Sequence, residues 1–397
     1  MKKVLALLLS STLILALLAG CGGQKAPAAT TDPNAKVIKI GVFEPSTGAN
    51  GAGGKQEILG IQYANSLTPT VDIGGETYTV QLEYADNASS TDKAPTAAQQ
   101  LVSKGVSVVL GSYGSAVSIA ASDIFKNNGI PAIGISCTNP QVTQGNTHYF
   151  RICFLDPFQG TVQATFATEK FQAKTAYCLA ELGNDYDVGL ANYFTEAFQK
   201  LGGTVRNETF PTGTSDFSSY LNNAKTQGAD VIFAPCAIDY ATLIIDQAAS
   251  QGITMPIMAG DTWDNNKVVE AAKGKSLQVY ASTFYQEGGN KEFDTGFKAF
   301  INGDPNNLKN NGGNDMINAV SALGYDVYYV ALEAIKAAGS SDSKAVNEAL
   351  WKVTYPGVTG QIAFDTVNGD AIRDTAYIKH VNTETGAWDL EKVQKIG

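Results

Sequence analysis

The chain has 397 residues, with 28 Lys and Arg against 38 Asp and Glu, so its formal net charge is −10. An acidic chain is a poor candidate for sequence-independent nucleic-acid binding, which needs a basic face. The length favours two or three domains, and 40 glycines with 17% charged residues are typical of a globular protein rich in loops.

The first segment of the chain is typical of an export signal. Two lysines precede an almost wholly apolar run over 4–20, which is at the short limit for a helix that spans a membrane and stays there. The run ends in LAGC, with Cys21 last, and this resembles the bacterial lipobox, in which the cysteine is lipidated. We therefore expect a signal peptide over 1–20 and a lipid anchor on Cys21. A small, polar, Pro-containing stretch, 21–36 with the lipidated cysteine, is expected to be a flexible tether.

Strand and helix patterns alternate from residue 37 onward. Apolar or alternating runs predict strands at 37–43, 78–84, 108–110 and 130–135, and the helical patterns between them cover 55–66, 94–104 and 116–126. A βαβαβ order is typical of a parallel sheet with helices on both faces.

A second α/β section of similar build follows, and then a helical one. Strands are predicted at 175–182, 205–210, 231–236, 256–260 and 277–283, and helices at 160–171, 188–201, 217–227 and 240–251. Helices at 291–301, 315–338 and 343–354 and β segments at 361–364, 374–381 and 388–393 complete the chain. The expected fold class is α/β with two lobes, and the helical section is expected to cross back to the first lobe.

The stretch 106–138 organises the first section. It predicts a strand, a Gly/Ser turn (111–115), a helix and a second strand that ends near Ser136. In an open parallel sheet the loops at the carboxyl ends of the strands share one edge, where ligands bind. Ser115 stands where the helix begins, so free N–H groups and the positive end of the helix dipole favour an anion there. The alternative is that Ser115 is only the N-cap of that helix.

The sequence offers little of the chemistry of enzymes or metal sites. It has only two histidines, His148 and His380, and it lacks HExxH, CxxC and GxSxG. The segment 48–55 is similar to a P-loop but has Ala49 where the first Gly is needed, and Gln56 follows it where Ser or Thr is needed. We therefore expect no catalytic residues, no metal and no cofactor.

Four cysteines besides Cys21 lie within or at the ends of apolar runs. An exported protein can form disulfides, and four cysteines allow three pairings among which sequence cannot choose. Buried free thiols are an equal alternative. These cysteines are Cys137, Cys153, Cys178 and Cys236.

Several short segments in this order and spacing resemble the type I periplasmic binding proteins, and more narrowly the branched-chain amino acid (Leu/Ile/Val) binding proteins of ABC importers. The segments are IKIGVFEPSTG at 38–48, the GS-x-x-S turn and ASDIF within 111–125, the loop after Ile135, NDYDVG at 184–189, SDF at 215–217, GAD at 228–230, MAGD at 258–261 and GQIAFDTVNGD at 360–370.

The resemblance implies how a ligand would be held. The carboxylate of an α-amino acid would meet Ser115 and the loop of Ser136, Cys137 and Thr138, with only backbone contact from Cys137. Asp261 matches the acidic residue that binds the ammonium group, one methylene shorter than the Glu common there, and Tyr186 matches a Tyr that closes over the ligand. Tyr113 and Ala237 complete the expected ligand-binding set. Such a zwitterion needs donors on one side and an anion on the other.

Simpler interpretations of three of these residues stay open. Asp261 could cap the helix that begins near Asn265, Tyr186 could be an aromatic residue on the rim, and the Thr138 hydroxyl could serve a turn. The chain also departs from the family at Gly53, where an aromatic residue is frequent, and at Ala237, where Tyr is frequent. These departures predict a roomier pocket that could take a larger or aromatic side chain.

The resemblance also implies the architecture and the partners. The first lobe is expected to comprise 37–155 with 285–364, and the second 156–284 with 365–397, hinged by crossings near Leu155, Phe284 and Phe364. We expect a monomeric, lipid-anchored, extracytoplasmic receptor that delivers an amino acid to an ABC permease in the membrane. One alternative is a ligand-sensing regulatory domain, and another is a binding protein for a short amide or urea-type solute.

Overall fold

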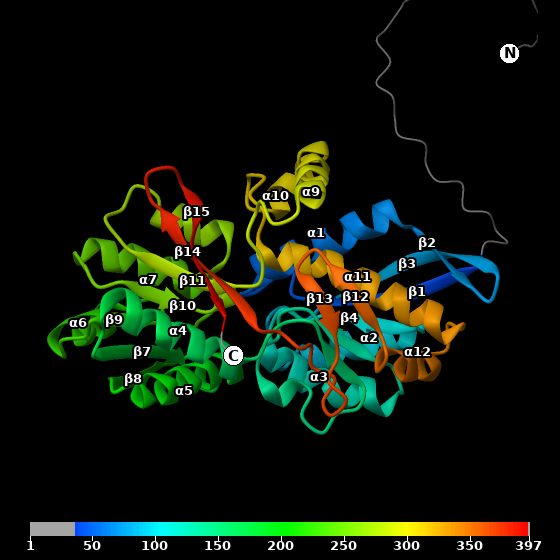
Figure 1. Cartoon of the computed structure of the whole chain (residues 1–397), viewed down its shortest axis with the longest axis horizontal. Helices are drawn as coiled ribbons and strands as arrows, with labels where there is room; N and C mark the ends of the chain where they lie inside the picture. Colours follow the sequence, from blue (N-terminus) through cyan, green and yellow to red (C-terminus); the bar gives the residue numbers. More distant parts are fainter. Residues whose placement is uncertain (1–35, 396–397) are drawn as a thin grey trace, which may run out of the picture. The chain divides into compact units, whose positions relative to one another are not determined.

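The computed structural model describes residues 36–395, and two large sheets organise them, each with helices against it (Figure 1). The predicted export signal and the predicted lipidation site, Cys21, lie outside the described residues. Among the described residues, no helix has both the length and the apolar character that a membrane crossing needs.

The first sheet is parallel except for one edge strand. Its strand order is β2-β3-β1-β4-β5-β6, and β2 is antiparallel to β3. Its strands are β1 (Val37–Glu44), β2 (Thr70–Ile73), β3 (Glu76–Asp86), β4 (Val108–Leu110), β5 (Ala132–Gly134) and β6 (Tyr149–Arg151). The helices of this part of the chain are α1 (Gly51–Leu67), α2 (Ala94–Lys104) and α3 (Ser115–Asn127).

The second sheet has the order β15-β14-β11-β10-β9-β7-β8. Strand β14 pairs antiparallel with both of its neighbours, β11 and β15. Its strands are β7 (Thr175–Glu181), β8 (Thr204–Phe210), β9 (Val231–Phe233), β10 (Ile257–Ala259), β11 (Val279–Thr283), β14 (Thr375–Asn382) and β15 (Ala387–Lys395). The helices between them are α4 (Asp156–Phe171), α5 (Asp185–Lys200), α6 (Ser218–Thr226), α7 (Ile238–Ser250) and α8 (Asn266–Ala272).

The remaining elements join the two halves. They are α9 (Lys291–Gly303), α10 (Pro305–Asn310), α11 (Ala319–Ala338), α12 (Ser343–Leu350) and the hairpin of β12 (Thr354–Gly357) and β13 (Gly360–Ala363). Helix α11 packs closely on α1 because glycines face the partner backbone. A Cβ on Gly60 would lie 2.0 Å from the Ser321 oxygen, and one on Gly324 would lie 2.3 Å from the Glu57 oxygen. The late helical section therefore covers the first sheet.

The central strands are short, apolar and fully buried. Strands β4, β5, β9 and β10 have three residues each, all buried, as expected where helices cover both faces of a parallel sheet. Local signals set the helix ends: the Asn184 side chain accepts hydrogen bonds from the first turn of α5, and Gly339 ends α11 in the left-handed conformation.

Some predicted boundaries were wrong. Helix α1 begins at Gly51, four residues before the predicted start. The glycines at 51, 53 and 54 form its buried first turn, where Gly53 and Gly54 pack against Tyr113 and Pro45. Helix α11 begins at Ala319 and not at 315. Strand β2 was missed, since its four residues are joined to β3 by the tight turn at Gly74 and Gly75.

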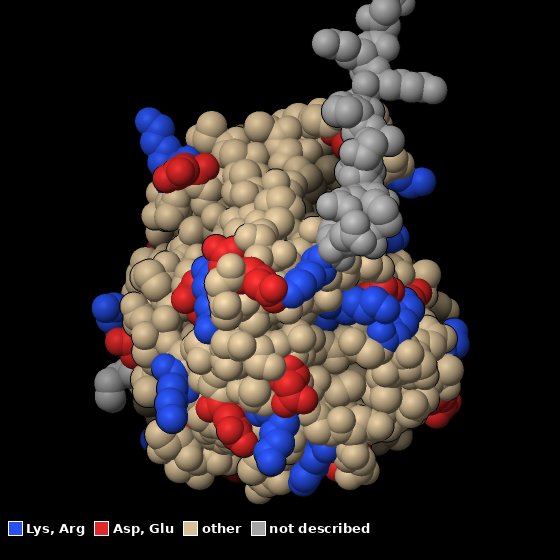
Figure 2. All heavy atoms as spheres, turned by 90° about the vertical axis from the view of Figure 1, so that its right-hand side faces the viewer, with Lys and Arg blue, Asp and Glu red and all other residues tan. Residues whose placement is uncertain are grey.

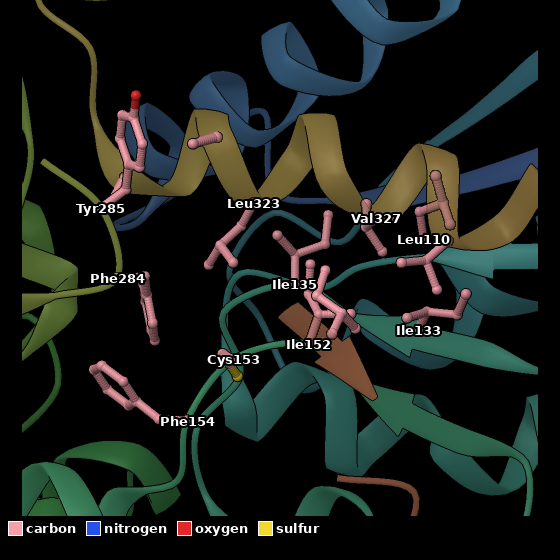
Figure 3. Close-up of a cluster of buried hydrophobic side chains, with 14 of the residues drawn as sticks. Leu110, Ile133, Ile135, Ile152, Cys153, Phe154, Phe284, Tyr285, Leu323 and Val327 are labelled. Carbon is pink, nitrogen blue, oxygen red and sulfur yellow. The ribbon is translucent and has the colours of Figure 1, made fainter. Parts of the chain in front are cut away.

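Aromatic side chains pack together near the three predicted chain crossings. The ring centroids of Phe154 and Phe284 lie 4.1 Å apart, and both rings belong to the large apolar cluster that Figure 3 shows in part, together with Leu110 and Ile133 of the first sheet. Phe364, at the third crossing, contacts Phe150 with centroids 5.3 Å apart. The lobe boundaries and the hinge remain a prediction.

The four cysteines of the described residues are buried free thiols, so the disulfide alternative is wrong for them in this structure. The surface carries charges of both signs. On the face shown in Figure 2, basic and acidic side chains are interspersed and form no single-sign patch.

Candidate functional site

The topology of the sheets brings polar loops to the carboxyl ends of adjacent strands. In the first sheet β1, β4 and β5 are neighbours, and in the second β10, β9 and β7 are neighbours. The predicted residues follow these strands: Tyr113 and Ser115 follow β4, Ser136 to Thr138 follow β5, Tyr186 follows β7, Ala237 follows β9 and Asp261 follows β10. This edge is where open α/β sheets bind ligands.

A cavity of about 40 Å³ lies among these loops. Of the predicted residues, Tyr113, Ser115, Tyr186 and Ala237 line it, together with Pro45, Asn50, Ser89, Gly114, Ala116, Val117, Asn184, Asp187 and Thr262. The loops of the two sheets touch around it. The Tyr113 hydroxyl donates to the Thr262 oxygen at 3.1 Å, and Asn265 Nδ2 donates to Gln56 Oε1 at 2.7 Å.

Ser115 is the first residue of α3, and Gly114 is the N-cap, so the N-cap alternative for Ser115 is wrong. The Ser115 hydroxyl oxygen instead accepts a hydrogen bond from the Asn139 N–H at 3.1 Å. The first N–H groups of a helix have no partner within it. Those of α3 open at the cavity, because Gly114, Ser115, Ala116 and Val117 all line it.

The loop after β5 lies beside the cavity and does not line it. The Ser136 hydroxyl donates to Glu57 Oε1 at 2.5 Å, so this hydroxyl cannot donate to a ligand carboxylate at the same time. The Cys137 oxygen accepts from Arg151 Nη1 at 2.9 Å, and burial raises the pKa of the Cys137 thiol to about 11. The Thr138 hydroxyl is buried and has no hydrogen-bond partner among residues 36–395.

Tyr186 and Asp261 form a hydrogen-bonded pair in the second half of the site. The Tyr186 hydroxyl donates to Asp261 Oδ1 at 3.0 Å, and Gln159 Nε2 donates to the same oxygen at 3.0 Å. Asp261 is 1% exposed, and Tyr186 is 6% exposed and no rim residue. Helix α8 is capped by Asn265, so Asp261 is not its cap. Tyr186 lines the cavity and Asp261 does not, so Asp261 contacts the cavity wall only through Tyr186 and its other neighbours.

Four further buried residues belong to this site and were missed by the sequence analysis: Glu44, Glu57, Asp156 and Gln159. Both carboxylate oxygens of Asp156 and Oε1 of Gln159 lack a hydrogen-bond partner within the described part of the chain. Asp156 and Gln159 lie at the start of α4 with an i, i+3 spacing, so they share one face of the helix, but this spacing does not indicate that the face is buried.

The electrostatics of the site are those of buried acids. Burial raises the pKa of Asp156 to about 8 and that of Asp261 to about 7, and the Asp261 charge adds to the first shift. The cavity is therefore lined by the first turn of α3, and the buried acid Asp261 lies next to it, in contact with Tyr186.

Aromatic rings are placed differently from the expectation. A Cβ on Gly53 would lie 2.3 Å from the ring of Tyr113, so the Tyr113 ring occupies the space that an aromatic residue at 53 would need. Trp263 Nε1 donates to the Cys236 oxygen, and the Tyr240 hydroxyl donates to Glu181 Oε1, so both side chains are held away from the cavity. The roomier pocket predicted from Gly53 and Ala237 is not what the structure shows.

Comparison with known proteins decides the family. The family model described as "Periplasmic binding protein" matches residues 37–386, and this range includes every strand of both sheets except β15. The chain belongs to the type I periplasmic binding proteins. Within them it falls in the branched-chain amino acid family: it is 28% identical over 342 residues to the Leu/Ile/Val-binding protein homolog 1 of Brucella melitensis, with 83% of this chain and 86% of that protein covered.

Solved structures of this family share the fold. The chain is similar to a leucine-binding protein of Thermotoga maritima, with a TM-score of 0.80, 33% identity, and coverage of 90% of this chain and 99% of that one. It is also similar to a branched-chain amino acid substrate-binding protein of Streptococcus pneumoniae, solved in complex with isoleucine, with a TM-score of 0.78, 27% identity, and coverage of 91% and 99%.

The family gives the general function. Proteins of this kind are extracytoplasmic substrate-binding proteins of ABC transporters and not enzymes. The chain is therefore a solute-binding protein, and the loops at the carboxyl ends of its parallel strands are the candidate solute-binding site.

Proposed function

We propose that this periplasmic binding protein captures an α-amino acid between its two lobes, as a lipid-anchored monomer, and delivers it to an ABC permease. The observation that carries the proposal is that one cavity is lined by the N-terminus of α3 and by Tyr186. The Tyr186 hydroxyl donates to the buried carboxyl group of Asp261, which lies next to the cavity and does not line it. An α-amino acid matches this arrangement, because its carboxylate can bind the helix N-terminus while its neighbouring ammonium group binds the buried acid.

The carboxylate of the ligand would bind at the start of α3. Three consecutive residues there, Ser115, Ala116 and Val117, line the cavity. Their N–H groups and the helix dipole favour an anion, and hydrogen bonds to a charged acceptor are stronger than those to a neutral one. The Ser136 hydroxyl is excluded from this role while it donates to Glu57, so Ser136 and Cys137 would serve through the backbone.

The ammonium group would bind on the acidic side. Asp261 and Asp156 are both buried, and the Thr138 hydroxyl lies within hydrogen-bonding reach of the Asp156 carboxyl group. An ammonium group has three N–H donors, which matches this set of acceptors. Asp261 lies behind the Tyr186 hydroxyl, so that hydroxyl would turn toward the ligand when the amine arrives.

The side chain of the ligand would face apolar groups. Tyr113, Ile238 and Val320 form a small buried cluster, and Ala52 packs against it. Val117, Pro45 and Ala237 line the cavity itself. Together with the relatives, which are named for Leu, Ile and Val, this favours an aliphatic side chain.

Ligand capture would use a hinge between 37–155 with 285–364 and 156–284 with 365–397. The rings of Phe154 and Phe284, which are in contact and tilted by 36°, lie at two of the expected crossings, so they would act as a packed pivot (Figure 3).

A thermal-shift screen of residues 22–397 tests the proposal, with the twenty amino acids and a set of short amides and aromatic acids as probes. A ligand at 100 times its Kd adds roughly 2.7 kcal/mol to stability, which such a screen detects. Leucine, isoleucine or valine is expected to give the largest shift. A shift with amides or aromatic acids but with no amino acid would contradict the proposal and leave only the family.

The lipid anchor is tested separately. Cys21→Ser is expected to release the mature chain from the membrane fraction and to leave ligand affinity unchanged, since Cys21 lies outside the ligand-binding lobes. Ser11→Ala, within the same leader, is the control. Membrane attachment of the Cys21→Ser protein would mean that 4–20 is retained as an anchor.

A further inference from the structure

Two buried glutamates lie behind the loops that surround the cavity. Glu44 is the last residue of β1 and is 1% exposed, and Glu57 lies in α1 and is fully buried. Their carboxyl groups lie within hydrogen-bonding reach of each other. A carboxyl group in such a place is unusual, because Glu is almost never fully buried without a partner.

Each glutamate holds one ligand loop with one oxygen. Glu44 Oε2 accepts from the Tyr113 N–H at 2.8 Å, and Glu57 Oε1 accepts from the Ser136 hydroxyl at 2.5 Å. The other oxygens, Glu44 Oε1 and Glu57 Oε2, have no donor elsewhere in 36–395. These two oxygens are therefore free to form a hydrogen bond with each other when one of the carboxyl groups is protonated.

Such a pair cannot hold two charges. Two carboxylates in contact and away from water repel each other, and sharing one proton satisfies both facing oxygens with one hydrogen bond. The titratable groups that face the pair are acidic: Tyr113, Cys137 and Tyr149 around Glu44, and Asp261 near Glu57. Burial, the largest cause, raises the pKa of Glu57 to about 8, and it raises the pKa of Glu44 as well.

We propose that Glu44 and Glu57 share one proton and act as positioning residues, which hold the loops at Tyr113 and Ser136 and link ligand affinity to that proton. This rests on the proposed function, because these loops are assigned to the ligand there. Loss of the proton would place a second negative charge behind the loop that meets the ligand carboxylate. Affinity then falls as the pH rises through the pKa of the pair, and binding in that range takes up a proton.

The geometry allows a substitution that mimics the shared proton. In Glu44→Gln the amide oxygen can accept from the Tyr113 N–H while the amide nitrogen donates to Glu57. In Glu57→Gln the oxygen can accept from Ser136 and the nitrogen can donate to Glu44. Each single variant keeps every hydrogen bond and has no shared proton to lose. Glu44→Ala removes the acceptor of Tyr113 and serves as the disruptive comparison.

The first arm of the experiment needs no ligand. Thermal stability of the ligand-free protein is measured between about pH 6 and pH 10 for the wild type, Glu44→Gln, Glu57→Gln and the exposed control Glu348→Gln. Wild type and control are expected to lose stability on the alkaline side more steeply than the two pair variants, since a raised carboxyl pKa destabilises the fold once the proton leaves. If the thermal stability of all four proteins depends on pH in the same way, the proposal that the two glutamates share a proton is wrong.

The second arm uses L-isoleucine as the probe and calorimetric titration over the same pH range. The wild-type Kd is expected to weaken at least about fivefold more than that of Glu44→Gln between pH 7 and pH 9.5; loss of the proton of isoleucine itself affects both proteins equally. Glu44→Ala is expected to bind more weakly than Glu44→Gln throughout. Parallel pH profiles, or equal affinities of these two variants, would overturn the positioning role. If L-isoleucine does not bind, the second arm is run with the amino acid that gives the largest thermal shift; if no amino acid binds, the proposed function fails, and the first arm still decides whether the pair shares a proton.

Discussion

The charge of Asp261 gives the sharpest test of how the ligand is held. In Asp261→Asn the remaining Oδ1 can still accept from Gln159 Nε2 and the Tyr186 hydroxyl, both at 3.0 Å in the wild type. The substitution therefore removes a charge and leaves the shape nearly unchanged. Leaving the ammonium of a bound amino acid without its counter-charge is expected to cost about 2–5 kcal/mol, which corresponds to a roughly 30- to 4000-fold weaker Kd.

The same substitution should change the ligand-free protein in the opposite direction. Burial raises the pKa of Asp261 to about 7, so the folded chain holds this proton more tightly than the unfolded chain does. The raised pKa therefore destabilises the fold increasingly as the pH rises from the ordinary carboxyl range toward 7, and the penalty is complete above 7, on the order of 4 kcal/mol. Asn carries no such penalty, and Asp261→Asn is expected to melt higher than wild type at pH 8.

The assay is calorimetric titration with the amino acid that the screen identifies, together with thermal melts without ligand. Asp123→Asn is the matched control, because Asp123 lies exposed on α3 and undergoes the same change of charge. Our assignment of the amine is refuted if Asp261→Asn binds the amino acid within about twofold of wild type, since a buried counter-charge is worth far more than that.

Two further predictions concern stability and pocket shape. Arg151→Met should destabilise the protein by about 3–5 kcal/mol, because the buried guanidinium donates to Asp370 at 2.5 Å and to the Cys137 and Asn139 oxygens at 2.9 and 2.5 Å. Urea unfolding measures this loss, with the exposed Arg206→Met as control. Equal losses of unfolding free energy in the two variants would refute the prediction. Gly53→Ala should cost about 1–3 kcal/mol by overpacking and weaken ligand binding, because its Cβ would lie 2.3 Å from the Tyr113 ring. Gly303→Ala, with open space around its Cβ, is the control; unchanged melting and Kd for Gly53→Ala would show that the ring moves aside freely.

Much of the fold was predictable because the strands are apolar runs and the connecting helices are periodic. The parallel order then places Ser115, Tyr186 and Asp261 at the edges of the sheets without any knowledge of contacts. The β2 strand was not predictable in this way, since four residues give too short a pattern.

The buried acids of the site could not be predicted from the sequence. Glu44, Glu57 and Asp156 look like solvent-facing charges in a sequence, and only tertiary packing shows that they are enclosed. The direction of the Ser136 hydroxyl depends in turn on Glu57, which lies 79 residues earlier in the chain. The position of the Tyr113 ring beside Gly53 likewise depends on tertiary packing. An aromatic ring is missing from position 53 of the sequence, but a residue of another loop supplies one at that place.

The pairing of β14 with β11 has a consequence for how the chain is made. Strand β11 ends at Thr283, but the strand that covers its edge begins only at Thr375, close to the end of the chain. Until those last residues emerge, the second sheet has a bare edge at β11, which is prone to pairing with other chains. The second sheet therefore cannot be completed before β14 has been made, and a chain that stops before β14 would leave the edge of β11 open to pairing with other chains.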